Sequence, residues 1–161
     1  MRYGEARIVL ETVRSSHSLR PFADIGAPLP LHLGAAGKVL LAWLSTGERT
    51  ALINISIARF THGQPIDLQA FTEQLERIKQ EGWASSDGER APGVAAIAAP
   101  IFDAQGRVAG AIALTAPSIR LSAKQRQLFT PLVYEAARRA SSDLGYTTPA
   151  LSEQILFKDN F

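Results

Sequence analysis

The short stretch Gly-Ala-Ala-Gly-Lys, residues 34–38, stands just before a strongly apolar run and has residue types that suit anion binding. The first amides of a helix have no partner within the helix, and they lie at the positive end of its dipole. Because Ala35, Ala36 and Gly37 have small side chains or none, a carboxylate or phosphate can reach such amides directly. Close packing of a helix against a sheet explains the same residues, so the stretch alone leaves both interpretations open.

A second set of small residues lies on two predicted strands, 93–102 and 107–117, which the turn 103–106 joins. Alternate residues of a strand share one face. One face of this hairpin is made of small residues: Val94, Ala96, Ala98, Ala111, Ala113 and Thr115. Such a face either admits a helix closely or leaves a cavity. If the helix start overhangs it, the two features form a pocket with an anion anchor at one end and an apolar body.

Other chemistry has little support in this sequence. The absence of cysteine excludes disulfides, thiolate metal sites and a cysteine nucleophile. His17, His32 and His62 lack metal-ligand spacing, and neither a nucleophile elbow nor a phosphate loop is present. Asp87 and Glu89 alternate in a polar loop, where solvation is the simplest interpretation. We therefore expect no catalytic residue, no metal and no cofactor.

Length and charge set the remaining bounds. A chain of 161 residues, 46% hydrophobic, is the size of one domain with a real core. Its 17 basic residues are interleaved with 15 acidic ones, which favours solvated surface over a nucleic-acid footprint. No segment approaches the roughly 20 apolar residues of a membrane span, and the N-terminus has no signal-peptide pattern. We expect a cytoplasmic domain without membrane contact.

The periodicity predicts an α+β architecture, a mostly antiparallel sheet flanked by helices. Residues 6–13 and 19–25 are predicted strands of a hairpin. A buried helix is expected to begin near 34–37, and a second to run from a capping box at Ser45 to about residue 53. Asp67 is the expected N-cap of a helix that Gly82 ends. Ser122 is expected to cap a long helix with a kink at Pro131 and an apolar stripe of Leu128, Leu132, Ala136, Ala140 and Leu144.

Three stretches resemble, in order and spacing, the C-terminal effector-binding domain of the IclR family of bacterial transcriptional regulators: LPLHLGAAGKVLLAWLS, LERIKQEGWASSDGERAPGVAAIAAPIFDAQGRVAGAIALTAPSIRLS and YEAARRASSDLG. The resemblance implies a GAF-like fold, with a sheet of about six strands, that binds a metabolite and forms dimers and tetramers. It also implies a winged helix-turn-helix domain on the N-terminal side, absent from these residues, through which alone DNA is bound. We expect 1–145 to be the effector-binding domain and 146–161 a tail.

The resemblance assigns ligand-contacting amides to Ala35 and Ala36. Small-acid binders of the family have an acidic residue where this chain has Ser86, a cysteine where it has Ala96, and two serines at the positions of Ala113 and Thr115. A small acid needs polar partners on most sides, and each unpaired one costs about 1 to 3 kcal/mol. We therefore expect a larger, more apolar organic acid, including an aromatic one.

The expected site comprises the amides of Ala35, Ala36 and Gly37, the hydroxyls of Ser86 and Thr115, a floor of Ala96, Ala98 and Ala113, and a wall of Leu40, Trp43 and Phe60. Core packing explains Trp43 equally, loop anchoring explains Phe60, and His32 is expected to pin its loop by a hydrogen bond. Two alternatives remain. One is a small hydrolase or isomerase that uses Ser86, Asp87 and His32; the other is a structural dimerisation module with a tightly packed alanine face.

Overall fold

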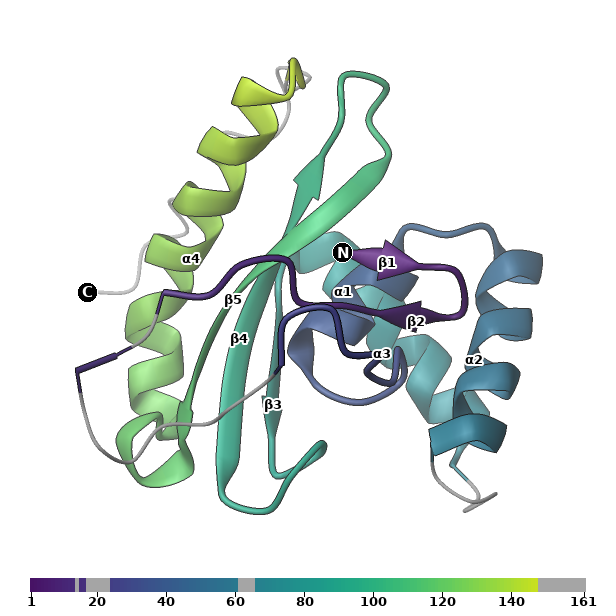
Figure 1. Cartoon of the computed structure of the whole chain (residues 1–161), viewed down its shortest axis with the longest axis horizontal. Helices are drawn as coiled ribbons and strands as arrows, with labels where there is room; N and C mark the ends of the chain where they lie inside the picture. The colour runs from purple at the N-terminus through teal and green to yellow at the C-terminus, as the bar shows by residue number, and fades with distance from the viewer. Residues whose placement is uncertain (14, 17–23, 61–65, 148–161) are drawn as a thin grey trace.

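A computed structural model describes residues 1–13, 15–16, 24–60 and 66–147. Three strands form an antiparallel sheet in the order β3-β4-β5, and a separate two-stranded hairpin precedes them. Figure 1 shows α4 on one face of the sheet, α1 and α3 on the other, and α2 beyond them. In chain order the elements are β1 (Arg2–Tyr3), β2 (Ala6–Arg7), α1 (Ala35–Ala42), α2 (Thr46–Phe60), α3 (Leu68–Glu81), β3 (Ala84–Asp87), β4 (Val94–Phe102), β5 (Val108–Pro117), a 3-10 turn (Ser118–Arg120) and α4 (Ala123–Asp143). The α+β prediction is confirmed.

The turn between β4 and β5 follows from Asp103 and Gly106. One carboxylate oxygen of Asp103 accepts hydrogen bonds from the amides of Gln105 and Arg107, both at 2.9 Å. Gly106 supplies a left-handed conformation with φ of 72°. This turn confirms the predicted hairpin and fixes the register that places Ala98 opposite Ala113.

The two faces of β4 belong to two different cores. Ala98 packs with the apolar residues of α1 and α3, whereas Ile97 on the other face packs against α4. The buried face of α4 is formed by Val133, Ala137 and Ser141. The predicted α4 stripe is therefore wrong: Leu128, Leu132 and Leu144 are 67%, 66% and 51% exposed.

The helix ends follow mostly from local chemistry. The carboxylate of Asp67 accepts from the amides of Gln69 and Ala70, and Gly82 ends α3 in the left-handed conformation. At α4, Ser122 and Gln125 form a reciprocal capping box. That helix continues through Pro131, where the sequence predicts a kink. Helix α2 runs further than predicted, to Phe60.

The N-terminal segment differs from the prediction. Of residues 6–13 only Ala6 and Arg7 form a strand, and they pair with β1 across a turn in which Gly4 has φ of 58°. Val9 forms a single parallel bridge to Ile25, where the predicted hairpin requires antiparallel pairing; most of the second predicted strand, residues 19–23, lies outside the described part. The implied sheet of about six strands is replaced, in the described residues, by sheets of three and two strands.

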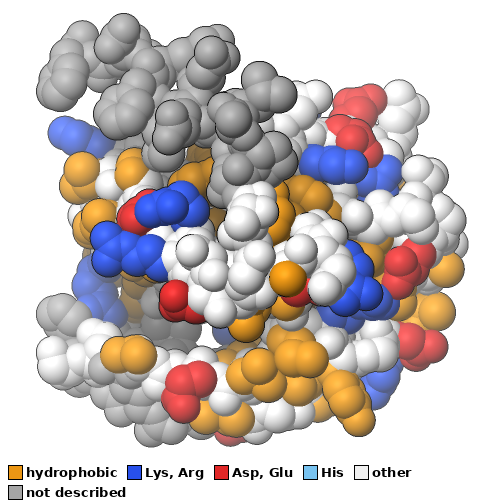
Figure 2. Space-filling model, turned by 90° about the horizontal axis from the view of Figure 1, so that it is seen from above, with side chains coloured by type: hydrophobic (Ala, Val, Ile, Leu, Met, Phe, Trp, Pro, Cys, Tyr) orange, Lys and Arg blue, Asp and Glu red, His pale blue; other side chains and the backbone are white. Residues whose placement is uncertain are grey.

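Charges are distributed over the surface in small groups. On the face in Figure 2, Lys and Arg side chains lie next to Asp and Glu. On α4, Arg138 and Arg139 both bind Glu135, at 2.7 and 2.9 Å, which agrees with the expected solvated helix surface. Within the described ranges, no helix has the length and apolar character to cross a membrane.

Candidate functional site

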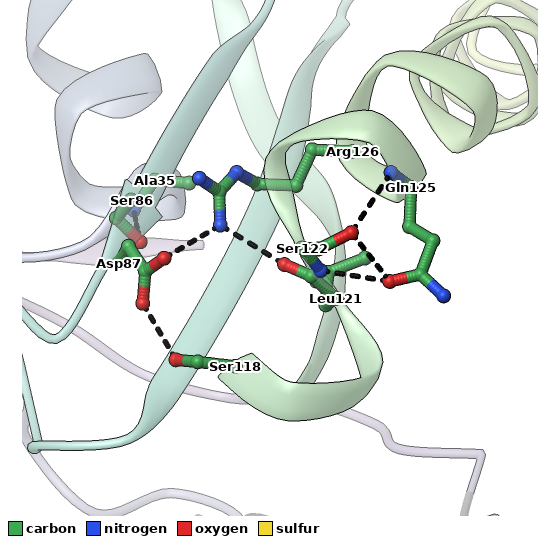
Figure 3. Close-up of polar contacts among 8 residues, drawn as sticks. All are labelled: Ala35, Ser86, Asp87, Ser118, Leu121, Ser122, Gln125 and Arg126. Carbon is green, nitrogen blue, oxygen red and sulfur yellow. Dashed lines mark hydrogen bonds and ion pairs between the residues drawn. The ribbon is translucent and has the colours of Figure 1, made fainter.

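The start of α1 already holds side chains of the protein itself. Gly34 is the N-cap residue, and its amide donates to Glu89 Oε2 at 3.0 Å. The amide of Ala35 donates to Ser86 Oγ at 3.1 Å (Figure 3). The amides of Ala36 and Gly37 meet no hydrogen-bond acceptor among the described residues. Two of the first four amides are therefore satisfied internally, and two have no acceptor in the described part of the chain.

Gly37 is required by close packing. A Cβ atom built on it would lie 2.2 Å from the carbonyl oxygen of Leu31, far inside van der Waals contact. The glycine therefore lets the helix approach the preceding loop. Close packing therefore explains Gly37, whereas the anion interpretation of Ala36 stays a prediction.

Lys38 is a buried structural residue. Its side chain is 1% exposed, and its ammonium donates to the carbonyl of Ser85 at 3.0 Å and to Glu89 Oε1. Glu89 in the β3–β4 loop thus bridges the ammonium of Lys38 and the amide of Gly34. This bridge ties the loop to the start of α1.

Arg7 supplies a cation that the sequence analysis missed. It is only 9% exposed, its Nε donates to the carbonyl of Pro30 at 3.0 Å, and it forms no ion pair with a described residue. Its Nη2 lies 3.8 Å from the position of a Cβ built on Gly34. Burial and, secondarily, the charge of Arg90 lower the pKa of Arg7 to about 10. No local pattern distinguishes this arginine from the strand around it, so the fold alone reveals it.

Most of the predicted sheet residues do come together. Strand register places Ser86, Ala96 and Thr115 in one row across β3, β4 and β5. The next row contains Ala98 and Ala113. Ala98 is fully buried and Ala96 half-buried, whereas Ala113 and Thr115 are exposed. The small-residue face is therefore covered near α1 and open to solvent at β5.

The predicted wall residues lie in other surroundings. Leu40 is 3% exposed and belongs to the core beneath α1. Trp43 packs against that core and meets Phe102 edge-on at 5.5 Å. Phe60 ends α2, where the guanidinium of Arg59 lies 5.3 Å from its ring centre. Core packing accounts for Leu40 and Trp43, and contact of any of the three with a ligand stays a prediction.

His32 does pin its loop. Its Nδ1 lies 2.7 Å from the hydroxyl of Ser56 on α2, and that hydroxyl also accepts from the amide of Leu31 at 3.0 Å. Burial lowers the pKa of His32, which favours the neutral ring. In the described part of the chain no three His, Asp or Glu side chains gather to hold a metal.

Asp87, next to Ser86, serves the opposite face of the sheet. Its carboxylate accepts from the hydroxyl of Ser118 at 2.5 Å and from Arg126 at 2.8 Å, as Figure 3 shows. These bonds lower the pKa of Asp87. Asp87 thus anchors the start of α4, and His32, which bonds Ser56 on α2, is not among its bonding partners; the geometry gives no catalytic pair.

Comparison with known proteins decides the class of this fold and site. Residues 1–142 match the family Bacterial transcriptional regulator IclR C-terminal. The chain belongs to the IclR family. The transcriptional regulator KdgR of Escherichia coli is 29% identical over 140 residues, which cover 86% of this chain and 53% of KdgR. The crystal structure of Pseudomonas aeruginosa HmgR superposes with a TM-score of 0.79 at 26% identity, over 92% of this chain and 59% of HmgR.

The crystal structure of the C-terminal domain of E. coli KdgR is a further match, with a TM-score of 0.66 at 30% identity over 76% of this chain and 75% of that domain. The chain spans about half the length of the curated relatives it matches. It is therefore the effector-binding domain of an IclR-family regulator, a bacterial cytoplasmic protein, and its relatives are transcriptional regulators, not enzymes.

Proposed function

We propose that this IclR domain binds an organic acid whose carboxylate meets the guanidinium of Arg7 and the amides of Ala36 and Gly37. The observation that carries the proposal is Arg7 itself, a nine-tenths buried cation without a carboxylate partner beside a helix start. Burying a charge is costly unless it is paired. An anion at this position pairs the cation and satisfies the two amides at once.

The small-residue face suits the apolar body of such an acid. Ala96 and Ala113 offer a surface without polar side-chain groups next to Ala98, which α1 covers, and an aromatic ring packs well on a flat apolar surface. Ser86 accepts from the amide of Ala35 and keeps a hydroxyl proton to donate. Thr115, in the same row, supplies a second hydroxyl. This combination supports a larger acid over one the size of pyruvate.

The place of the domain in a regulator is also a proposal. The matched relatives carry names such as HTH-type transcriptional regulator, and this chain covers about half of the length of each. We assign residues 1–145 to the effector-binding domain, 146–161 to a tail, and DNA binding to an N-terminal helix-turn-helix domain. We also propose self-association to dimers or tetramers, which light scattering can test, because an effector acts by favouring one arrangement over another.

Calorimetry and thermal shift test the acid. Benzoate is compared with pyruvate, and a ligand at 100 times its dissociation constant adds about 2.7 kcal/mol, which shifts the melting temperature by roughly 5 to 10 °C. Arg7→Met removes the cation and Ala96→Phe fills the floor, and both should abolish binding. Arg107→Gln, which removes a cation at the β4–β5 turn, is the matched control and should bind normally.

Two results would count against the proposal. If Arg7→Met binds the acid as tightly as the parent, the carboxylate lies elsewhere. If neither acid, nor any other aromatic or aliphatic carboxylate, raises the melting temperature or gives a heat of binding, the domain is better explained as a packed module without an effector. Consumption of the acid during incubation would indicate an enzyme instead.

A further inference from the structure

A second region, between the 32–33 loop and α3, has the properties of a ligand site. His32 is 2% exposed, and its Nε2 is a buried nitrogen without a hydrogen-bond partner. The hydroxyl of Ser56 accepts from the amide of Leu31 and lies 2.7 Å from Nδ1 of His32, so Nδ1 is the ring nitrogen with a partner. Nε2 is a donor in the tautomer in which Nδ1 accepts from that hydroxyl. A buried donor without an acceptor costs free energy, which an acceptor on a ligand recovers.

His32 borders a groove of about 400 Å³, a size typical of small-molecule sites. One wall is formed by Ile66, Ala70 and Phe71, and the other end by Gln74 and Arg77 on the same face of α3. Ala70 and Arg77 are seven residues apart, so the groove extends about 10 Å along the helix. The groove therefore has an apolar end and a polar end.

Arg77 is unusual among the arginines of α3 and α4. It has Glu73 and Glu81 one turn away on either side, the spacing at which helical ion pairs form. It nevertheless makes no hydrogen bond or ion pair with a described residue, whereas Arg126, Arg138 and Arg139 all bind carboxylates. Gln74 beside it also has no partner in the described part of the chain. Arginine and amide donors thus line the groove together with His32.

Carboxylates within the groove do not compete for these donors. Both oxygens of Glu89 are engaged by Gly34 and Lys38. Asp67 caps α3 through the amides of Gln69 and Ala70, at the apolar end. Arg77 and Gln74 therefore keep their donors for a ligand, in a groove whose lining also includes the carboxylates of Glu89 and Asp67.

From this geometry we propose a second binding site, separate from the Arg7 site, for a small carboxylic acid with an apolar tail. The carboxylate binds Arg77 and Gln74, beside His32 at the edge of the groove, and the tail lies on Phe71 and Ile66. The planar guanidinium of Arg77 can donate two parallel hydrogen bonds to the two oxygens of a carboxylate. The groove is lined by residues of α3 and those just before it and by the 32–33 loop together with Glu89, and by no residue of β4 or β5, so the proposal does not depend on the proposed function of the sheet face.

Hexanoate is the probe, and hexanamide, which has the same tail without the charge, is the control compound. Backbone amide shifts of the ¹⁵N-labelled domain locate binding: the groove predicts changes at Leu33, Ala70, Phe71 and Gln74. Arg77→Gln should weaken hexanoate at least tenfold. Lys79→Gln removes a positive charge from the same helix outside the groove and should leave the affinity unchanged.

The variant Ala96→Phe separates the two sites. It blocks the sheet face but should leave hexanoate shifts in the groove unaltered, and Arg77→Gln should leave benzoate binding at Arg7 unaltered. The groove proposal is wrong if hexanoate shifts only residues of the sheet face, if hexanamide binds equally well, or if Arg77→Gln and Lys79→Gln weaken binding alike.

Discussion

Replacing Glu89 by glutamine should lower stability and raise the affinity for an acid at the same time. Lys38 is 1% exposed and loses the only carboxylate that binds its ammonium, although the carbonyl of Ser85 remains. Loss of a charged hydrogen bond at such a site costs about 2 kcal/mol. Because glutamine keeps an acceptor for the Gly34 amide, we do not expect unfolding. The melting temperature should fall by about 4 to 8 °C.

The affinity for the acid should rise in Glu89→Gln because Glu89 places a negative charge beside the proposed carboxylate site. Two carboxylates about 6 Å apart near a protein surface repel by about 2 to 3 kcal/mol. Removing one should therefore tighten benzoate binding at least about tenfold. Glu76→Gln breaks a similar pair, in which Arg49 is 7% exposed, and leaves the start of α1 untouched.

Urea unfolding and calorimetry on the same samples measure both effects. The control Glu76→Gln should lose stability without a change in affinity. If Glu89→Gln binds benzoate no better than the parent, the bound carboxylate is not close enough to Glu89 to be repelled by it. The assignment of the carboxylate to the amides of Ala36 and Gly37 is then refuted. A stability loss under about 0.5 kcal/mol would refute the structural role of the Lys38 pair.

Three further outcomes follow from single residues. Gly37→Ala places a methyl group against the carbonyl of Leu31 and should cost about 3 kcal/mol or more in urea unfolding, whereas Gly47→Ala on α2, where a Cβ meets nothing within 4 Å, should stabilise by about 0.5 to 1 kcal/mol. Burial lowers the pKa of His32, so the unfolded chain takes up the proton first as pH falls. Relative to His32→Gln, the free energy of unfolding of the parent should therefore fall by up to about 1.4 kcal/mol per pH unit below about 6.5. Parallel curves for the two proteins would contradict this. The bonds from Ser118 and Arg126 lower the pKa of Asp87, so the stability advantage of the parent over Asp87→Asn should be full above the ordinary carboxyl pKa and shrink as pH falls below it, and an advantage independent of pH would exclude the charge as its source.

Local signals in the sequence predicted much of the helical structure. Asp67, Gly82 and Ser122 act through bonds to amides or through backbone conformation within a few residues, and each does what its residue type indicates. The β4–β5 hairpin likewise depends on a short turn and on alternation. These features need no knowledge of the rest of the fold.

Errors occurred where the outcome depends on distant parts of the chain. The apolar residues of α4 support two helical stripes, and contact with β4 selects the one containing Val133 and Ala137, not the one containing Leu128. Residues 8–13 have strand-forming types, but in the described structure this segment pairs only at Ile8, through hydrogen bonds with Met1, and at Val9, through a bridge to Ile25. Tertiary context decides such cases.

The candidate site likewise has a part that local sequence patterns predict and a part that depends on distant segments of the chain. Alternation within strands placed Ser86, Ala96 and Thr115 on one face, and the register of β3 and β4 then aligned them in a row. By contrast, Glu89 at the helix start and Arg7 beside it come from segments far apart in sequence. Pairing of such residues leaves no spacing pattern that a single sequence can reveal.

The end of β3 joins two helices through one peptide bond. Ser86 holds the first amide of α1 on one face of the sheet, and Asp87 holds Arg126 and Ser118 at the beginning of α4 on the other. Successive strand residues share one planar peptide unit, so a displacement of the strand backbone at one of them also displaces the other. A ligand that shifts the backbone of Ser86 should therefore also shift Asp87 and, through its bonds to Ser118 and Arg126, the start of α4.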